Sequence, residues 1–117
     1  MLRNSVLLVI VLALLSVPLA AENVEGILVD KMCSGKIVEK GYGAAKMHTK
    51  MCALMDNCKA SGFGVVTADG KFLKFDAEGD KQALKALEGT DKNDNITVKV
   101  DGKVSGGNLK VKSLTLT

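Results

Sequence analysis

A chain of 117 residues with a formal net charge of +3 is long enough for one small domain with a thin hydrophobic core. Its 16 Lys and Arg nearly balance its 13 Asp and Glu, which does not favour a polyanionic partner. One Tyr, three Phe and no Trp supply too few rings for a base-stacking surface, so the composition argues against nucleic-acid binding.

The N-terminal residues have the pattern of a secretory signal peptide. Arg3 supplies a positive start, residues 6–17 form an almost uninterrupted apolar run, and residues 18–21 offer small side chains for cleavage. The run is shorter than the roughly 20 residues that span a bilayer, which argues against an anchor. We therefore expect residues 1–21 to be removed, residues 22–117 to form a single domain without a membrane span, and the protein to be periplasmic or secreted.

The expected domain contains five strands and two helices. The strands are predicted at residues 24–31, 63–68, 71–76, 96–104 and 109–116, and the helices at about 44–61 and 80–87. Asp69-Gly70 and the turn at residues 105–108 are typical of β-hairpin connections. The glycine-containing stretch between Cys33 and the first helix is predicted to be a loop, and Gly62 is expected to end that helix in a left-handed conformation.

The apolar alternation slips by one residue within the last strand. Leu109 and Val111 share one face, whereas Leu114 and Leu116 share the other, which predicts a β-bulge of the kind that curves a sheet. Three strands, a helix and a curved terminal hairpin predict a mainly β fold, a small OB-like five-stranded barrel plus two helices. The helix at about 44–61 would be an insertion between the first two strands. The alternative is an open α+β sheet with both helices on one face.

Sulfur and imidazole groups are concentrated in one stretch of the chain. All three cysteines, the single His and every Met beyond the signal lie between Met32 and Cys58. Such groups are the soft ligands and redox centres of proteins, so this stretch is predicted to carry any chemistry. In an exported protein, three cysteines indicate one disulfide with a spare thiol, a reduced set held by a metal, or a disulfide between chains.

Helical geometry sorts these residues into two lines if residues 44–61 form one regular helix. The first line is predicted to face the core, with its methionines filling gaps: Met47, Met51, Leu54, Met55 and Cys58. His48, Cys52 and Asp56 form the second line, where His48 and Cys52 stand one turn apart.

The same geometry constrains disulfide pairing. Cys52 and Cys58 would be separated by about 9 Å of helical rise, too far for a bridge. Cys33 is therefore the expected partner of one of them, and the inward position of Cys58 favours Cys33–Cys58, with Cys52 as the alternative partner. If Asp56-Asn57 ended the helix early, Cys52 and Cys58 could pair instead.

A metal site is the alternative use of the same residues. Its ligands would be Cys33, His48, Cys52 and Cys58, with Asp56 as another option for the fourth position, and its metal zinc or copper.

Catalysis is not expected. The sequence has no C-x-x-C exchange motif, and a Cys–His pair would have to work in a small domain with little room for a substrate cleft. We therefore expect no enzyme and no catalytic residue.

The runs GILVDKMC, HTKMCALMDNC, SGFGVVTADGKFLKFD and VKVDGKVSGGNLKVKSL cover nearly all of the expected mature chain. They resemble a group of small exported bacterial domains of OB-like architecture with no assigned activity, most specifically through Cys33, His48, Cys52 and Cys58. The resemblance implies fold and export, and it assigns no catalytic residue. The expected function is an exported, non-enzymatic binding or structural module stapled by one disulfide, with a protein or small ligand as partner; the alternative is soft-metal binding.

Overall fold

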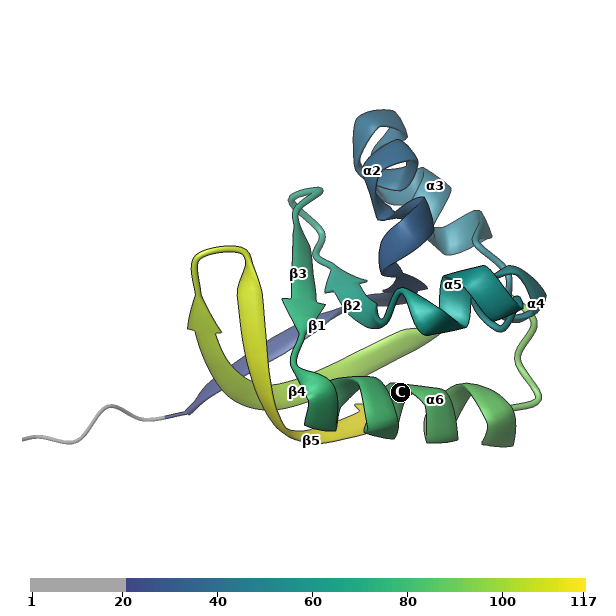
Figure 1. Cartoon of the computed structure of the whole chain (residues 1–117). Coiled ribbons are helices and arrows are strands. Elements are labelled where there is room, and N and C mark those ends of the chain that lie inside the picture. The colour runs from purple at the N-terminus through teal and green to yellow at the C-terminus, as the bar shows by residue number, and fades with distance from the viewer. Residues whose placement is uncertain (1–20) are drawn as a thin grey trace, which may run out of the picture.

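The computed structural model describes residues 21–117, which form one five-stranded sheet and five helices (Figure 1). The expected signal peptide, residues 1–21, lies outside the described residues except for Ala21. Within the described part, no helix is long and apolar enough to cross a membrane.

The strands are β1 (Glu22–Asp30), β2 (Phe63–Val66), β3 (Phe72–Phe75), β4 (Thr97–Ser105) and β5 (Asn108–Leu116). Hydrogen bonding runs in the order β1-β2-β3-β5-β4, and β4 also pairs with β1, so the order returns to its start. All pairs are antiparallel except β3 with β5. The prediction of five strands is confirmed, each within a few residues of its expected position.

The predicted turns and the bulge are confirmed as well. β2 and β3 form a hairpin through Gly70, whose φ of +82° is the left-handed conformation that favours glycine. β4 and β5 form the terminal hairpin, in which Asp101 pairs with Ser113 but Gly102 pairs with Val111. The residue skipped in β5 is Lys112, and this extra residue brings Leu114 and Leu116 back to the face of Leu109 and Val111, so that all four contact the same apolar cluster.

Strand β1 separates two apolar clusters. Leu28 belongs to the larger cluster, which includes Phe63, Val98 and Leu109, whereas its neighbours Ile27 and Val29 pack into a smaller cluster. The smaller cluster is completed by Ile37, Ala45 and Val66, the first two from the helical segment between β1 and β2. The C-terminal half of β1 is therefore covered on both faces.

Helix α6 (Ala77–Gly89) covers the larger cluster and lies at the bottom of the view in Figure 1, below α4 and α5 and farther from α2 and α3. It begins three residues before the expected start because Asp76, rather than Asp80, caps it by accepting from Gly79 N. Asp80 instead accepts hydrogen bonds from Phe63 N and from the Lys74 ammonium. Gly79 allows close packing, since a Cβ there would lie 2.5 Å from Val111 Cγ2.

The prediction of a loop after Cys33 is wrong, because those residues form α2 (Lys31–Lys40). Asp30 begins the helix by accepting a hydrogen bond from Cys33 N, and Gly41, with φ of +102°, follows its last residue. Gly35 lies inside the helix at an uncrowded position, where a glycine costs stability without preventing helix formation.

The prediction of a single helix at residues 44–61 is also wrong. Three short helices take its place: α3 (Tyr42–Met47), α4 (Lys50–Ala53) and α5 (Asp56–Ala60). The first break falls at His48 and Thr49, both extended, where the Thr49 hydroxyl accepts from Cys52 N and starts α4. The second falls at Met55, also extended in ψ. Each break changes the helical phase, so positions on the expected wheel no longer share a face.

Candidate functional site

The end of β1 places a carboxylate beneath the helical segment. Asp30 is fully buried, and one of its oxygens accepts from Cys33 N at 3.0 Å. The other accepts from His48 Nε2 at 2.7 Å, which joins the α3–α4 junction to the strand. The ring of His48 is 9 % exposed. No buried side-chain polar atom of the described residues lacks a partner, so Asp30 is satisfied where it lies.

The hydrogen bonds to Asp30 decide its charge. Burial alone would raise the pKa of this carboxyl, but the hydrogen bond from His48, the bond from Cys33 N and the favourable interaction with the imidazole together lower the pKa below its ordinary value. Asp30 is therefore ionised at neutral pH. An ionised acceptor requires the proton on His48 Nε2, which leaves Nδ1 with its lone pair when the ring is neutral.

Two cysteines from separate helices meet beside this carboxylate. Cys33 lies in the first turn of α2 and Cys58 within α5, and the two residues approach to 4.2 Å. Their Sγ atoms and a carboxylate oxygen of Asp30 all lie within 4.8 Å of one another. Cys58 is 6 % exposed, and Cys33 is half-buried.

Both thiols in this group are held in their protonated form. Burial, followed by the negative charge of Asp30, raises the pKa of Cys33 to about 11. The same two causes raise the pKa of Cys58. Because the thiolate is the reactive form of cysteine, neither group is an activated nucleophile at neutral pH.

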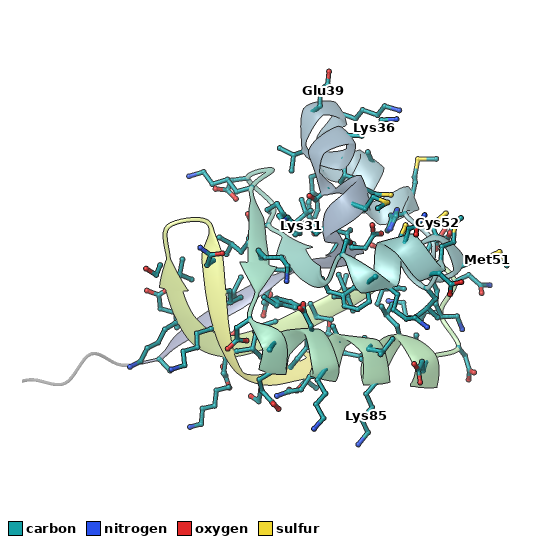
Figure 2. All side chains as sticks on the ribbon, viewed as in Figure 1. Lys31, Lys36, Glu39, Met51, Cys52 and Lys85 are labelled. Carbon is teal, nitrogen blue, oxygen red and sulfur yellow. The ribbon has the colours of Figure 1, made fainter. Side chains whose placement is uncertain are left out.

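The structure brings together only part of the expected ligand set. Cys33 and Cys58 meet as expected, and His48 reaches them through Asp30. Cys52 is exposed on α4 (Figure 2) and does not belong to the three-residue group. Asp56 is exposed at the start of α5. Asp30 was not predicted as a site residue because this residue was assigned to the end of a strand. An Asp three residues before Cys33 is suited to cap a helix, and this position could have indicated its role.

The predicted burial of the methionines is wrong. Met47, Met51 and Met55 are 77 %, 80 % and 59 % exposed, and Met51 points away from the protein in Figure 2. Of the five residues expected to form the core stripe, Cys58 is buried and Leu54 packs against the larger cluster. The helix breaks at His48–Thr49 and at Met55 account for the difference.

An open groove of about 370 Å³ leads to the thiol side of the site. Cys33, Met47 and His48 line it, together with Lys36, Ile37, Lys40 and Ala44 from α2 and α3. A larger cavity of about 580 Å³ lies between β3 and the terminal hairpin, where Lys74, Lys103 and Lys110 are among the lining residues. Because the larger cavity contains no cysteine or histidine, we place the candidate site at the groove.

No family model, no curated protein and no solved structure matches this chain. The assignment of a function therefore depends on the site itself.

Proposed function

We propose that this protein is an exported, non-enzymatic binding module of OB-like barrel architecture, in which a disulfide between Cys33 and Cys58 fastens the helical segment. The barrel interpretation is supported by five strands whose hydrogen-bonded order returns to β1, and by the helix between β3 and β4. Export follows from the expected signal peptide.

The observation that carries the proposal is the approach of Cys33 and Cys58 to 4.2 Å. A disulfide is about 2.05 Å long, so modest side-chain movement would close it. Cys33 begins the helical segment and Cys58 lies near its end, so one bond would constrain α2 to α5 in the unfolded chain. Loop closure of this length contributes roughly 3 kcal/mol.

The environment of the thiols supports a structural rather than a catalytic pair. A thiol of high pKa is a poor attacking group and a poor leaving group in thiol–disulfide exchange. Cys33, with a pKa of about 11, has both properties. Once formed, the bond would therefore exchange slowly.

Peptide mapping of protein exported to the periplasm tests this proposal. Alkylation in denaturant without reductant, followed by mass spectrometry, should label Cys52 alone and recover a peptide linked through Cys33 and Cys58. A linkage through Cys52 would contradict the proposed pair, and three labelled cysteines in metal-free protein would contradict any disulfide.

A metal site is the second candidate, favoured by the Asp30 carboxylate beside the two sulfurs. Two thiolates and a carboxylate are a donor set suited to zinc, and His48 would orient Asp30 as an outer hydrogen-bond partner. Metal binding requires both thiols to be reduced, so one molecule cannot contain both the metal and the Cys33–Cys58 disulfide. Three labelled cysteines together with one equivalent of zinc or copper would select this candidate.

A further inference from the structure

The exposed apolar side chains of the described chain are almost all methionines. The large apolar residues that are exposed comprise four methionines and Val38; no Leu, Ile or Phe is among them. If this surface served only to bury apolar area, leucine, isoleucine and phenylalanine would serve equally well. Apart from Val38, the feature that these exposed apolar residues share is a sulfur atom.

Three of these methionines lie in one nine-residue segment together with an exposed thiol. We call Met47, Met51, Cys52 and Met55 the sulfur surface; Met51 and Cys52 both lie on α4 (Figure 2). The inner side of α4 is defined by Ala53, which is 1 % exposed and packs into the larger cluster. Met51 and Cys52 are the exposed residues of α4, and exposed Met47 and Met55 flank this helix in the sequence.

The segment is held in place by its backbone rather than by these side chains. Lys50 N donates to Asn93 O at 2.7 Å, and Asn95 N donates to Lys46 O at 2.8 Å. Because these hydrogen bonds hold the main chain against the loop before β4, the exposed side chains extend from an ordered backbone. A ligand would not have to order that backbone when it binds.

Two of the neighbouring positive charges make contacts of their own. The Lys50 ammonium donates to Thr90 O at 2.8 Å, and the Lys46 ammonium lies 5.3 Å from the centre of the Tyr42 ring. Asp56 is exposed beside Met55 and contributes a negative charge. Lys36 and Lys40 line the groove beside Met47 and His48, so Asp56 offsets only part of the positive charge near the sulfur surface.

His48 adds a nitrogen donor next to Met47. Its Nε2 is bound to Asp30, and the ring lines the same groove as Met47. A buried carboxylate that holds one ring nitrogen is the usual outer support of a metal-bound histidine, with the other nitrogen as the ligand. Nδ1 of neutral His48 is free for that role.

From these observations we infer that the sulfur surface binds one reduced copper ion, Cu(I), with Nδ1 of His48 as an additional donor. Thioether and thiol sulfur select Cu(I) over harder cations, which prefer oxygen ligands. The site needs neither Cys33 nor Cys58, so it is compatible with the staple. Cu(I) binds by coordination only, and no electron transfer to the protein is involved.

Competition with a chromophoric Cu(I) chelator under anaerobic conditions tests the inference. Ascorbate keeps the copper reduced without reducing disulfides, so the state of Cys33 and Cys58 is preserved. The intact mature protein should withdraw one equivalent of Cu(I), and X-ray absorption of the loaded protein should show sulfur neighbours. Zinc should not compete at equal concentration.

Three sets of variants locate the ion. The triple variant M47L/M51L/M55L keeps the apolar area while removing the thioethers, and it should lose Cu(I) binding, whereas Met32→Leu, at an exposed methionine outside the segment, should retain it. Cys52→Ser should weaken binding. His48→Gln should also weaken it, while circular dichroism shows the folded state of each variant.

The results that would contradict Cu(I) binding differ from those that would contradict the Cys33–Cys58 disulfide. Unchanged binding by the triple variant would overturn the inference, and so would absence of Cu(I) binding by the wild type. Loss of binding in Cys33→Ser with retention in the triple variant would place the ion at the Asp30–Cys33–Cys58 group instead. Peptide mapping of the same wild-type sample reports the staple independently.

Discussion

His48 donates a 2.7 Å hydrogen bond from Nε2 to Asp30, a residue with no solvent exposure. The bond connects the end of β1 with the α3–α4 junction, 18 positions later in the chain. The same carboxylate caps α2. One side chain thus fixes two parts of the helical segment on the strand.

Replacing this carboxylate should destabilise the fold strongly. Asp30→Ala should lower the free energy of unfolding by about 3–5 kcal/mol, because it removes a helix cap and leaves a buried imidazole without its charged partner. Asp30→Asn, which keeps an oxygen acceptor, should cost less, about 1–3 kcal/mol. Urea denaturation measures both. The exposed control Asp91→Asn should stay within about 0.5 kcal/mol of the wild type.

The Asp30 contribution should depend on acid pH. Its pKa is lowered in the folded protein, so its stabilising effect is complete above the unfolded value of about 3.9 and is lost as the pH falls toward the lower folded value. The difference in unfolding free energy between wild type and Asp30→Asn should therefore be constant from pH 7 to 5 and shrink below about pH 4. A difference that stays constant down to pH 3 would show that the carboxylate charge is not the cause.

The three cysteine substitutions should differ in cost. In oxidised, metal-free protein, Cys33→Ser and Cys58→Ser should each lower stability by roughly 2–4 kcal/mol, and the double variant should cost little more than either one, because the same bond is lost. Cys52→Ser should stay within about 0.5 kcal/mol, since Cys52 is exposed. Additive losses in the double variant would contradict a shared bond.

The reduced thiols should react at very different rates. At pH 7.5 iodoacetamide should modify exposed Cys52 first and leave Cys33 and Cys58 largely unmodified, because burial and Asp30 raise their pKa values. For Cys33 the rate should continue to rise with pH toward about 11. Mass mapping of a time course on native protein measures each site, and rapid modification of Cys33 at neutral pH would contradict its described environment.

Two glycine-to-alanine substitutions in helices should have opposite signs. Gly79→Ala should destabilise by about 1–3 kcal/mol, because its Cβ would meet Val111 and Phe75. Gly35→Ala should stabilise by about 0.5–1 kcal/mol, since nothing lies within 4 Å of its Cβ position. Thermal unfolding of the matched pair checks both signs, and stabilisation by Gly79→Ala would show that α6 lies farther from the sheet.

The parts of the structure that could be predicted are those set by local chemistry. The turn at Gly70 and the bulge at Lys112 follow from backbone conformations and strand alternation that neighbouring residues impose. The helical segment could not be predicted in the same way, because Thr49 had to compete as a cap against continuation of a helix. Once that competition was misjudged, the wheel wrongly placed Met51 and Met55 in the core, although it placed Cys58 and Leu54 on the inner side.

The candidate site was predictable in its sulfur atoms but not in its carboxylate. Cys33 and Cys58, the favoured disulfide partners, do lie close together, but both are free cysteines in the structure, and their pairing was predicted on the assumption of a regular helix. The role of Asp30 depends on two helices covering the end of β1, which no local pattern reports. Burial of the thiols, followed by the negative charge of Asp30, raises the pKa values of Cys33 and Cys58.

The position of β1 between two apolar clusters bears on how the molecule unfolds. Ile27 and Val29 cannot leave the smaller cluster without disturbing Leu28 in the larger one, since all three belong to one strand. The helices before β2 are consequently not a separable appendage, and a chain lacking residues 31–62 would expose apolar surface on β1 and β2. Amide hydrogens of α2 and of β4 should therefore exchange through one cooperative opening rather than in two independent steps.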